Sequence, residues 1–346
     1  MQRQWLNHAV LRLRLRPKEP ILVKSGVTSP LAEVDDSPIV TRRRDSNGKE
    51  ELIPFIPGTS LKGVLRSHFE RVAKTVSVEA VCNVFKPDCC SSLYGPIIKN
   101  VGKKVEEKEE VEKEYISKSA LGYQYSCPSC KTFGSLIFAG RMNISDAYPD
   151  SDHMPVSQGE VRDGVGIDRV TGGAFRGAKF QYQVVVGGEY LTEISITNFE
   201  LWQLGLWGIF ISDSLAGMIS VGSGSSRGFG RIEMIPDDRD DSPCFQLSFP
   251  RSYAGMSDGT TIRGISALSD PKGHTALDYG LVTDIQLDQI EVTESPDSGL
   301  SLNGVRETWG YSSEKASNIF NELGDVLFEY LHRCPAWDKK YERSYA

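Results

Sequence analysis

The chain has 346 residues and a formal net charge of −7, with 39% hydrophobic and 25% charged residues. These values are ordinary for a soluble globular protein that can bury a large core. No apolar run of about 18 residues is present, which argues against a membrane-spanning helix and a membrane partner. The first residues lack the apolar segment of a signal peptide, so we expect a cytoplasmic protein.

Positive charge is concentrated in the first third of the chain. Residues 1–105 contain 18 Lys and Arg against 10 Asp and Glu, and an acidic chain with such a basic part can still bind a polyanion. Within 9–16, Arg12, Arg14 and Arg16 alternate with leucines. This pattern predicts a half-buried strand with a basic outer face, which is either solvated or in contact with RNA.

The remaining pattern predicts short strands around two helices. The turn residues 45–48 indicate a hairpin, 150–180 is expected to be a loop, and Asn198 is expected to begin the second helix. The expected strands are 39–43, 52–56, 136–144, 180–186, 190–196, 218–221 and 230–235, and the expected helices are 60–75 and 198–213, with 180–186 and 190–196 forming a hairpin around Gly187 and Gly188.

In its essentials this order is strand, helix, two strands, helix, strand, which is typical of an α+β, ferredoxin-like domain and of RRM domains that bind RNA. We therefore expect a core over 1–236 with an insertion at 76–132. Residues 237–346 form an expected C-terminal extension with a helix at about 313–332. The acidic segment 106–114 is assigned no chemistry.

The segment from Ile56 to Ser67 reads IPGTSLKGVLRS. Thr59 or Ser60 can cap a helix, and such an N-terminus is suited to an anion. Lys62 and Arg66 lie four residues apart and therefore share a helix face. The alternative is an ordinary capped amphipathic helix with a solvated basic face.

The cysteines cluster between positions 82 and 130. A Cys-x-x-Cys pair at Cys127 and Cys130, with further cysteines upstream, is typical of tetrahedral zinc sites. The preferred ligand set is Cys82, Cys90, Cys127 and Cys130, with Cys89 as the substitute for Cys90. A redox pair and free buried thiols are the alternatives, and a zinc ion here would be structural.

Three loops carry further candidate residues. Asp35 and Asp36 can hold a divalent cation or orient a hydroxyl, although Asp-Ser-Pro is also a common turn. The segment 222–231 is rich in glycine and serine and places Arg227 where it could bind phosphate, or it is a plain hairpin turn. The segment 166–176 carries Arg169, Phe175 and Arg176, which could stack on RNA or form an ordinary surface loop.

In combination these motifs resemble the RAMP superfamily of CRISPR systems, and specifically the backbone subunits of type III interference complexes. The resemblance covers about 9–236. It rests on five segments in chain order: DSPI from Asp36, PFIPGTSLKGVLR from Pro54, CPSCKTFGS from Cys127, IDRVT from Ile167 and GSSRGFGRI from Gly224.

The resemblance implies a ferredoxin-like palm, an inserted zinc-bearing or helical lobe, and a protruding thumb hairpin that corresponds to 167–180. Asp36 matches the acidic residue that cleaves target RNA, with Mg²⁺ or another divalent cation. Lys62 and Arg66 match a helix that grips the guide. We predict RNA contacts at nine residues: Arg42, Ser60, Lys62, Arg66, Arg169, Thr171, Arg176, Gly224 and Arg227.

The implied function is a subunit that binds CRISPR RNA beside other RAMP and effector subunits. It would cleave guide-paired, single-stranded target RNA at regular intervals as a metal-dependent endoribonuclease, by attack of a 2′-hydroxyl. Base pairing would supply the sequence selection. The alternatives are an architectural subunit that does not cleave and, further away, a ribonuclease that processes precursor RNA.

Overall fold

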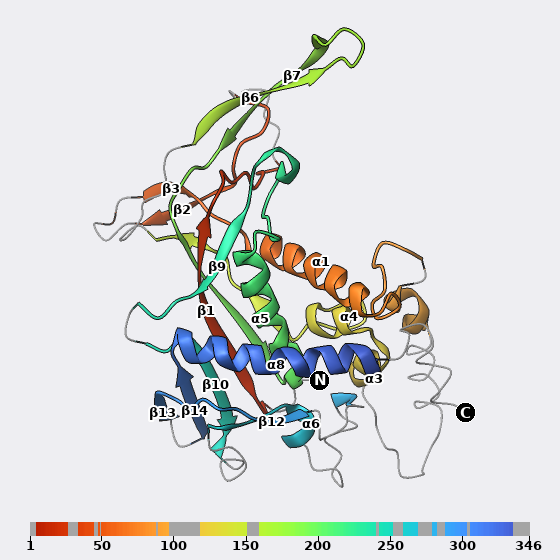
Figure 1. The fold of residues 1–346 in the computed structure, drawn as a ribbon, viewed down its shortest axis with the longest axis vertical. Helices are drawn as coiled ribbons and strands as arrows, with labels where there is room; N and C mark the ends of the chain where they lie inside the picture. Colours follow the sequence, from red (N-terminus) through yellow and green to blue (C-terminus); the bar gives the residue numbers. More distant parts are fainter. Residues whose placement is uncertain are drawn as a thin grey trace.

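A computed structural model describes most of the chain (Figure 1). The described residues are 5–26, 34–44, 48, 50–87, 89–96, 118–150, 159–239, 242–251, 259–268, 279–281, 288–302 and 305–334. The acidic segment 106–114 therefore lies outside the described residues, and so does the expected turn at 45–47.

The largest unit of the fold is an antiparallel sheet of eight strands, which differ in length. Its order is β13-β14-β10-β1-β8-β4, and β9 also pairs with β1 while β5 pairs with β8. The strands are β1 (His8–Pro17), β4 (Met142–Ile144), β5 (Tyr148–Pro149), β8 (Tyr190–Thr197), β9 (Ile232–Pro236), β10 (Phe245–Pro250), β13 (Ser298–Leu302) and β14 (Arg306–Tyr311).

Strand β1 is the centre of this sheet. Leu11, Leu13 and Leu15 are buried while the arginines between them face the opposite side, so the predicted half-buried strand is confirmed. One edge of β1 pairs along its length with β8. Its other edge is shared, because β10 pairs with 8–11 and β9 with 13–17. The sheet thus continues into residues beyond 237.

The three long helices are α1 (Gly58–Val76), α5 (Leu201–Leu215) and α8 (Ser313–Arg333). In Figure 1, α8 crosses in front of the strands, while α5 and α1 lie to the right of β9 and β1. Trp202 of α5 stacks on Tyr330 of α8, with ring centroids 4.3 Å apart. Gly205 permits this packing, since a Cβ there would lie 2.4 Å from the carbonyl oxygen of Leu323. The predicted helices are confirmed, including the one at the C-terminal end.

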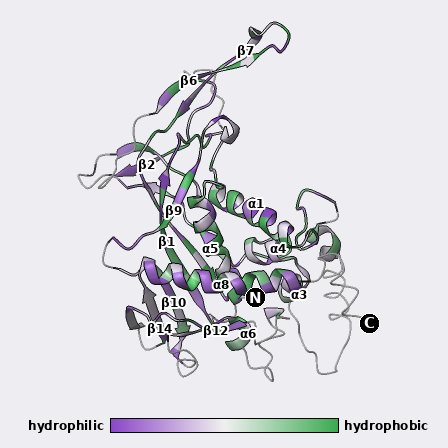
Figure 2. Cartoon of the chain, viewed as in Figure 1, coloured by the Kyte–Doolittle hydropathy of each residue, from purple (hydrophilic) through white to green (hydrophobic). Residues whose placement is uncertain are grey.

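The described part of the chain has no helix with the length and apolar character needed to cross a membrane. In Figure 2, hydrophilic and hydrophobic residues alternate along α1 and α8, and the strongly apolar α5 has only 15 residues. Shorter elements complete the fold: α3 (Lys118–Tyr125), α4 (Pro128–Phe133), the 3₁₀ turn η1 (Ser225–Arg227), α6 (Ile265–Leu268), and the paired strands β11 (Thr261–Arg263) and β12 (Gln289–Glu291).

The expected loop at 150–180 is wrong for 160–167 and 174–180, which the structure places in strands. Strands β6 (Glu160–Ile167) and β7 (Ala174–Val184) form an antiparallel hairpin that projects from the rest of the molecule (Figure 1). The turn is closed by Asp168, whose carbonyl accepts the Gly172 N–H at 2.9 Å and whose carboxylate accepts the Thr171 hydroxyl at 3.0 Å. The Asp168 carboxylate also accepts the Val170 N–H at 3.0 Å. This Asx-type contact and the positive φ of Gly172 are ordinary turn signals.

The expected hairpin between 180–186 and 190–196 is also wrong. β7 pairs with β6, whereas β8 pairs with β1 and β4, so the glycine pair at 187–188 joins two different sheets. The expected strand 136–144 is reduced to β4. Of the expected strands 218–221 and 230–235, only β9 has a run of sheet pairing, beside a single bridge between Ser220 and Arg231.

The two expected helix caps are wrong as well. Helix α1 begins at Gly58 after Pro57, and the side chains of Thr59 and Ser60 do not cap it. Asp146 accepts the Gly58 N–H instead, at 2.7 Å. Helix α5 is instead capped by Glu200, which forms a capping box. Asn198 lies two residues before this cap, with a φ of 54°, and is not part of the helix.

The hairpin around 45–48 is confirmed as strands β2 (Val40–Arg44) and β3 (Glu50–Pro54), which pair in antiparallel register. The two strands lie beside the base of the β6–β7 hairpin in Figure 1.

Candidate metal centre and nucleic-acid interface

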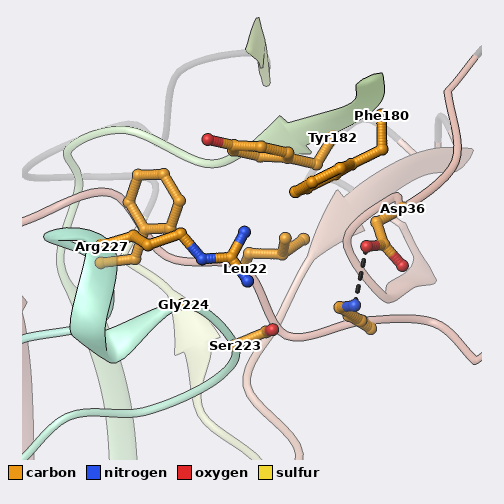
Figure 3. Close-up of a pocket in the computed structure, with 9 residues that line it drawn as sticks. Leu22, Asp36, Phe180, Tyr182, Ser223, Gly224 and Arg227 are labelled. Atoms are coloured by element: carbon orange, nitrogen blue, oxygen red, sulfur yellow. Dashed lines mark ion pairs between the residues drawn. The ribbon is translucent and has the colours of Figure 1, made fainter. Parts of the chain in front are cut away.

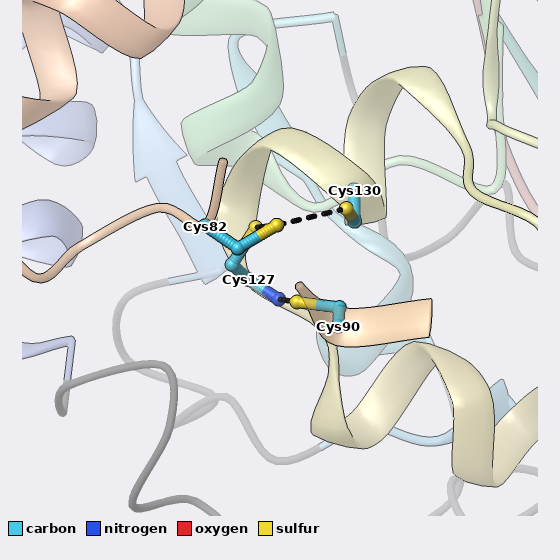
Figure 4. Close-up of side chains that lie close together, drawn as sticks. All are labelled: Cys82, Cys90, Cys127 and Cys130. Carbon is cyan, nitrogen blue, oxygen red and sulfur yellow. Dashed lines mark hydrogen bonds between the residues drawn. The ribbon is translucent and has the colours of Figure 1, made fainter. Parts of the chain in front are cut away.

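Four buried cysteines come together from three segments. Cys127 precedes α4 and Cys130 lies within it, while Cys82 and Cys90 come from the chain after α1. Their sulfur atoms all lie within 4.8 Å of one another (Figure 4). The Cys82 Sγ is 3.7 Å from the sulfur atoms of both Cys127 and Cys130.

This geometry fits a metal ion such as zinc. Four sulfur atoms at the usual zinc–sulfur distance of about 2.3 Å lie about 3.8 Å apart in a tetrahedron. Cys89 lies outside the quartet, since its sulfur contacts the Ser92 hydroxyl at 3.5 Å. The structure therefore selects Cys90 over Cys89. A hydrogen bond with Cys127 raises the pKa of Cys90 far above its ordinary value, so the four thiols do not ionise together without a cation.

Arg66 connects the quartet to helix α1. Its guanidinium lies 3.4 Å from the Cys130 sulfur and donates to the Gly134 carbonyl and to Glu70, each at 3.0 Å. Glu70 also accepts the Ser129 hydroxyl at 2.7 Å. Burial opposes the charge of Arg66, but the Cys130 sulfur and Glu70 outweigh it and raise its pKa. Arg66 thus offsets negative charge at the quartet.

A second candidate site is a pocket at the base of the β6–β7 hairpin, with a volume of about 250 Å³ (Figure 3). Its apolar wall is formed by Leu22, Tyr182 and Phe229, which belong to a small separate cluster, and by Phe180, which packs against that cluster. Its lining residues are Leu22, Lys24, Asp36, Phe180, Tyr182, Ser223, Gly224, Arg227 and Phe229.

Asp36 reaches the pocket because its backbone pairs with β7. It forms a parallel bridge with Tyr182, and its carbonyl accepts the Gln183 N–H at 2.9 Å. The Asp36 side chain is 29% exposed, and its carboxylate lies 2.7 Å from the Lys24 Nζ. The carboxylate of Asp35 instead accepts the Gln181 N–H at 2.7 Å. Asp36 therefore lines the pocket, whereas Asp35 fastens the segment to β7.

The glycine-rich segment 222–230 forms the opposite wall. Its Ser223 N–H donates to the Leu22 carbonyl at 2.8 Å. Gly222 is needed for this approach, since its φ is 91° and a Cβ would lie 2.4 Å from the Leu22 oxygen. Arg227 then places its guanidinium over the Phe180 ring, 5.5 Å from the centroid. The structure thus brings together Asp36, Gly224 and Arg227 from the residues that the sequence singled out.

Helix α1 contributes no lining residue to this pocket. Lys62 donates to the Met142 carbonyl at 2.9 Å, and burial together with the neighbouring Arg66 lowers its pKa. The Asp146 carboxylate occupies the first N–H of the helix. The expected anion site at this N-terminus is therefore already occupied by a carboxylate of the protein itself, close to Ser60.

The other candidate RNA-binding residues lie on hairpins. Arg169 is exposed at the tip of the β6–β7 hairpin, and Arg176 is exposed on β7. Thr171 bonds to Asp168 within the same turn. Arg42 lies on β2 with its side chain 80% exposed and a distant contact of 3.9 Å to Glu50. None of these residues lines the pocket.

Sequence reasoning missed Lys24 and the aromatic wall of the pocket. Phe180 and Tyr182 alternate along β7, which is a detectable strand signal. Nothing local connects them to Lys24 or to Phe229, which lie far away in the chain, so only the folded structure places these side chains around Asp36.

The antiparallel sheet and its helices define a mixed α/β protein, which carries a cysteine quartet suited to hold a metal ion and a basic pocket with an aromatic wall. Comparison with family models matches residues 15–233 to the RAMP superfamily, and the chain belongs to that family. The family supports a CRISPR-associated, RNA-binding role. The match runs from β1 to β9 and includes both candidate sites. No curated protein matches the sequence.

Proposed function

We propose that this chain is a CRISPR RNA-binding backbone subunit of a type III effector complex, and that it cleaves guide-paired target RNA at regular intervals. The family match and the order of the motifs support this role. Its partners would be the guide RNA, the single-stranded target RNA and other RAMP and effector subunits.

The sheet supports a ferredoxin-like palm within this proposal. Strands β9, β1, β8 and β4 lie side by side in that order and are all antiparallel to their neighbours. Along the chain, helix α1 lies between β1 and β4, and helix α5 lies between β8 and β9. This is the strand-helix-strand-strand-helix-strand pattern of that fold. The projecting β6–β7 hairpin corresponds to the thumb, and a zinc ion held by the cysteine quartet would be structural.

The observation that carries the proposed cleavage is the position of Asp36. Its carboxylate lines a pocket that also contains two cations, Lys24 and Arg227, and two hydroxyl-bearing side chains, Ser223 and Tyr182. Attack of an RNA 2′-hydroxyl on the adjacent phosphate needs in-line geometry and an acceptor for one proton. Asp36 can accept that proton while the cations bind phosphate oxygens.

The pocket also bears on the expected divalent cation. Mg²⁺ often binds through a single carboxylate together with water and substrate phosphates. Asp36 is the one carboxylate among the residues that line the described pocket, so it would hold such an ion only with oxygen atoms of bound RNA. The ion would supply charge stabilisation at the phosphate.

The test is Asp36→Asn in the assembled complex with guide RNA, with Asp35→Asn as the matched control. We expect Asp36→Asn to abolish interval cleavage and to leave target binding intact. Asp35→Asn should keep cleavage, because its carboxylate bonds to the backbone of β7 and does not line the pocket. Cleavage at every interval by the Asp36→Asn complex would overturn the catalytic assignment.

The second candidate is an architectural subunit that binds guide RNA without cleaving the target. The ion pair between Asp36 and Lys24 favours it, because a carboxylate held by an ammonium group at 2.7 Å is neutralised. This candidate expects target binding by the wild-type complex without any interval products. A precursor-processing ribonuclease would instead cleave RNA as the isolated chain.

A further inference from the structure

Lys24 and Asp36 lie on one face of a short two-stranded ribbon at the edge of the pocket. The Ser25 N–H donates to the Ser37 carbonyl at 3.0 Å, and Lys24 bridges to Pro38. In this register the side chains of Lys24 and Asp36 are diagonal neighbours across the ribbon. Their ion pair is therefore built into the backbone pairing.

The charge of the pocket is positive. Its charged lining residues are Lys24, Asp36 and Arg227, which are two cations and one carboxylate. The Lys24 side chain is 44% exposed, so it can leave Asp36 without disturbing the core. Arg227 is held over the Phe180 ring. A pocket with this balance attracts an anion such as a phosphodiester.

The carboxylate of Asp36 by itself would repel that phosphodiester, since two negative charges close together in a small, partly buried pocket repel each other. Lys24 is the cation closest to Asp36 and can relieve this repulsion. An ammonium group is a compact point charge on a flexible stem, and it can move between two anionic partners.

We propose that Lys24 is a phosphate-binding catalytic residue of this pocket. It pairs with Asp36 before RNA binds and then transfers its contact to the scissile phosphate, which frees the carboxylate. This inference rests on the proposed function. In the reaction the 2′-oxygen bonds to phosphorus as the bond from phosphorus to the 5′-oxygen breaks. The 2′ proton passes to Asp36, the 5′-oxygen takes a proton from water, and Lys24 keeps its charge.

The first test measures single-turnover cleavage by the assembled complex carrying Lys24→Met or Lys24→Arg. Loss of one preorganised charge contact to a transition state lowers rates by about 10²-fold or more. We expect that loss for Lys24→Met and a change of only a few fold for Lys24→Arg. Lys18→Met is the control, because Lys18 is similarly exposed and ion-paired, to Glu233 at 3.1 Å, but does not line the pocket.

The second test measures target RNA binding against salt in the Asp36→Asn background. If Lys24 contacts phosphate, adding Lys24→Met reduces the slope of log affinity against log salt by about 0.7–0.9. If Lys24 serves only to neutralise Asp36, the slope is unchanged, because that carboxylate is already absent. An unchanged slope, or wild-type cleavage by Lys24→Met, refutes the inference.

The two proposals fail in different ways. Cleavage that survives Asp36→Asn overturns the proposed function, whatever Lys24 does. Cleavage that is lost in Asp36→Asn but retained in Lys24→Met overturns only the role of Lys24. A complex that never cleaves still tests the phosphate contact through the salt slope.

Discussion

Replacement of single cysteines gives a sharp test of the metal centre, because two adjacent cysteines have different environments. Cys90 belongs to the quartet, and its sulfur accepts the Cys127 N–H at 3.3 Å. Cys89 is also buried, but its sulfur faces Ser92. Cys90→Ser should therefore weaken zinc binding, whereas Cys89→Ser should leave it unchanged.

The expected magnitude follows from the ligand set. Groups that only support a metal ligand typically change affinity by about 10–100-fold, so loss of one of four thiolates should cost at least about 100-fold. That loss corresponds to about 2.7 kcal/mol of stability when zinc binds only the folded chain. For a chain of this size it lowers Tm by about 4 °C or more.

The assays are metal content of the purified protein, competition with a chromophoric chelator, and calorimetry with and without chelator. We expect one zinc ion per chain, with Tm falling on chelation for wild type and for Cys89→Ser alike. An equal loss of zinc in Cys89→Ser and Cys90→Ser would refute the assignment of ligands. The metal centre itself would be refuted if the wild-type protein contained no zinc and its Tm did not change when a chelator was added.

Three further predictions concern the pocket and the core. Gly222→Ala should weaken RNA binding more than Gly228→Ala in binding assays, because both have positive φ but only Gly222 meets a backbone carbonyl. Burial, with a further contribution from Glu200, raises the pKa of Asp288 to about 7. Asp288 is then protonated when folded but ionised when unfolded, so between about pH 4 and 7 stability should fall with rising pH by on the order of 1 kcal/mol per unit. In Asp288→Asn, Tm should vary less over that window. Asp146→Ala removes the acceptor of the first N–H of α1 and should cost about 1 kcal/mol in chemical unfolding.

Much of the fold could be predicted because it has local signals. The alternation of β1, the apolar stripes of α1 and α8, the strongly apolar run of α5, and the turn between β2 and β3 all depend on residues close together in the chain. The cysteine quartet was predicted from ligand chemistry, which restricts the possible sets strongly.

Strand partners could not be predicted in the same way. The pattern of 180–186 predicts a strand, but it does not reveal whether that strand pairs with the preceding or the following one. The glycine pair at 187–188 looks like a hairpin turn and in fact carries the chain from one sheet to another. Lys24 was missed for the same reason, since its ion pair with Asp36 depends on the register of a ribbon.

The ion pairs of the basic residues also indicate which of these residues can bind a polyanion. Arg14 and Arg16 on the outer face of β1 both pair with Glu189, whose side chain is only 3% exposed. A buried carboxylate needs such partners, because an unpaired one is strongly destabilising. The predicted basic face of β1 therefore serves the fold. Exposed arginines of β2 pair instead with Glu50, whose side chain is 50% exposed. In the proposed function these arginines, those exposed on the β6–β7 hairpin, and the pocket of Asp36 and Lys24 therefore supply the RNA contacts.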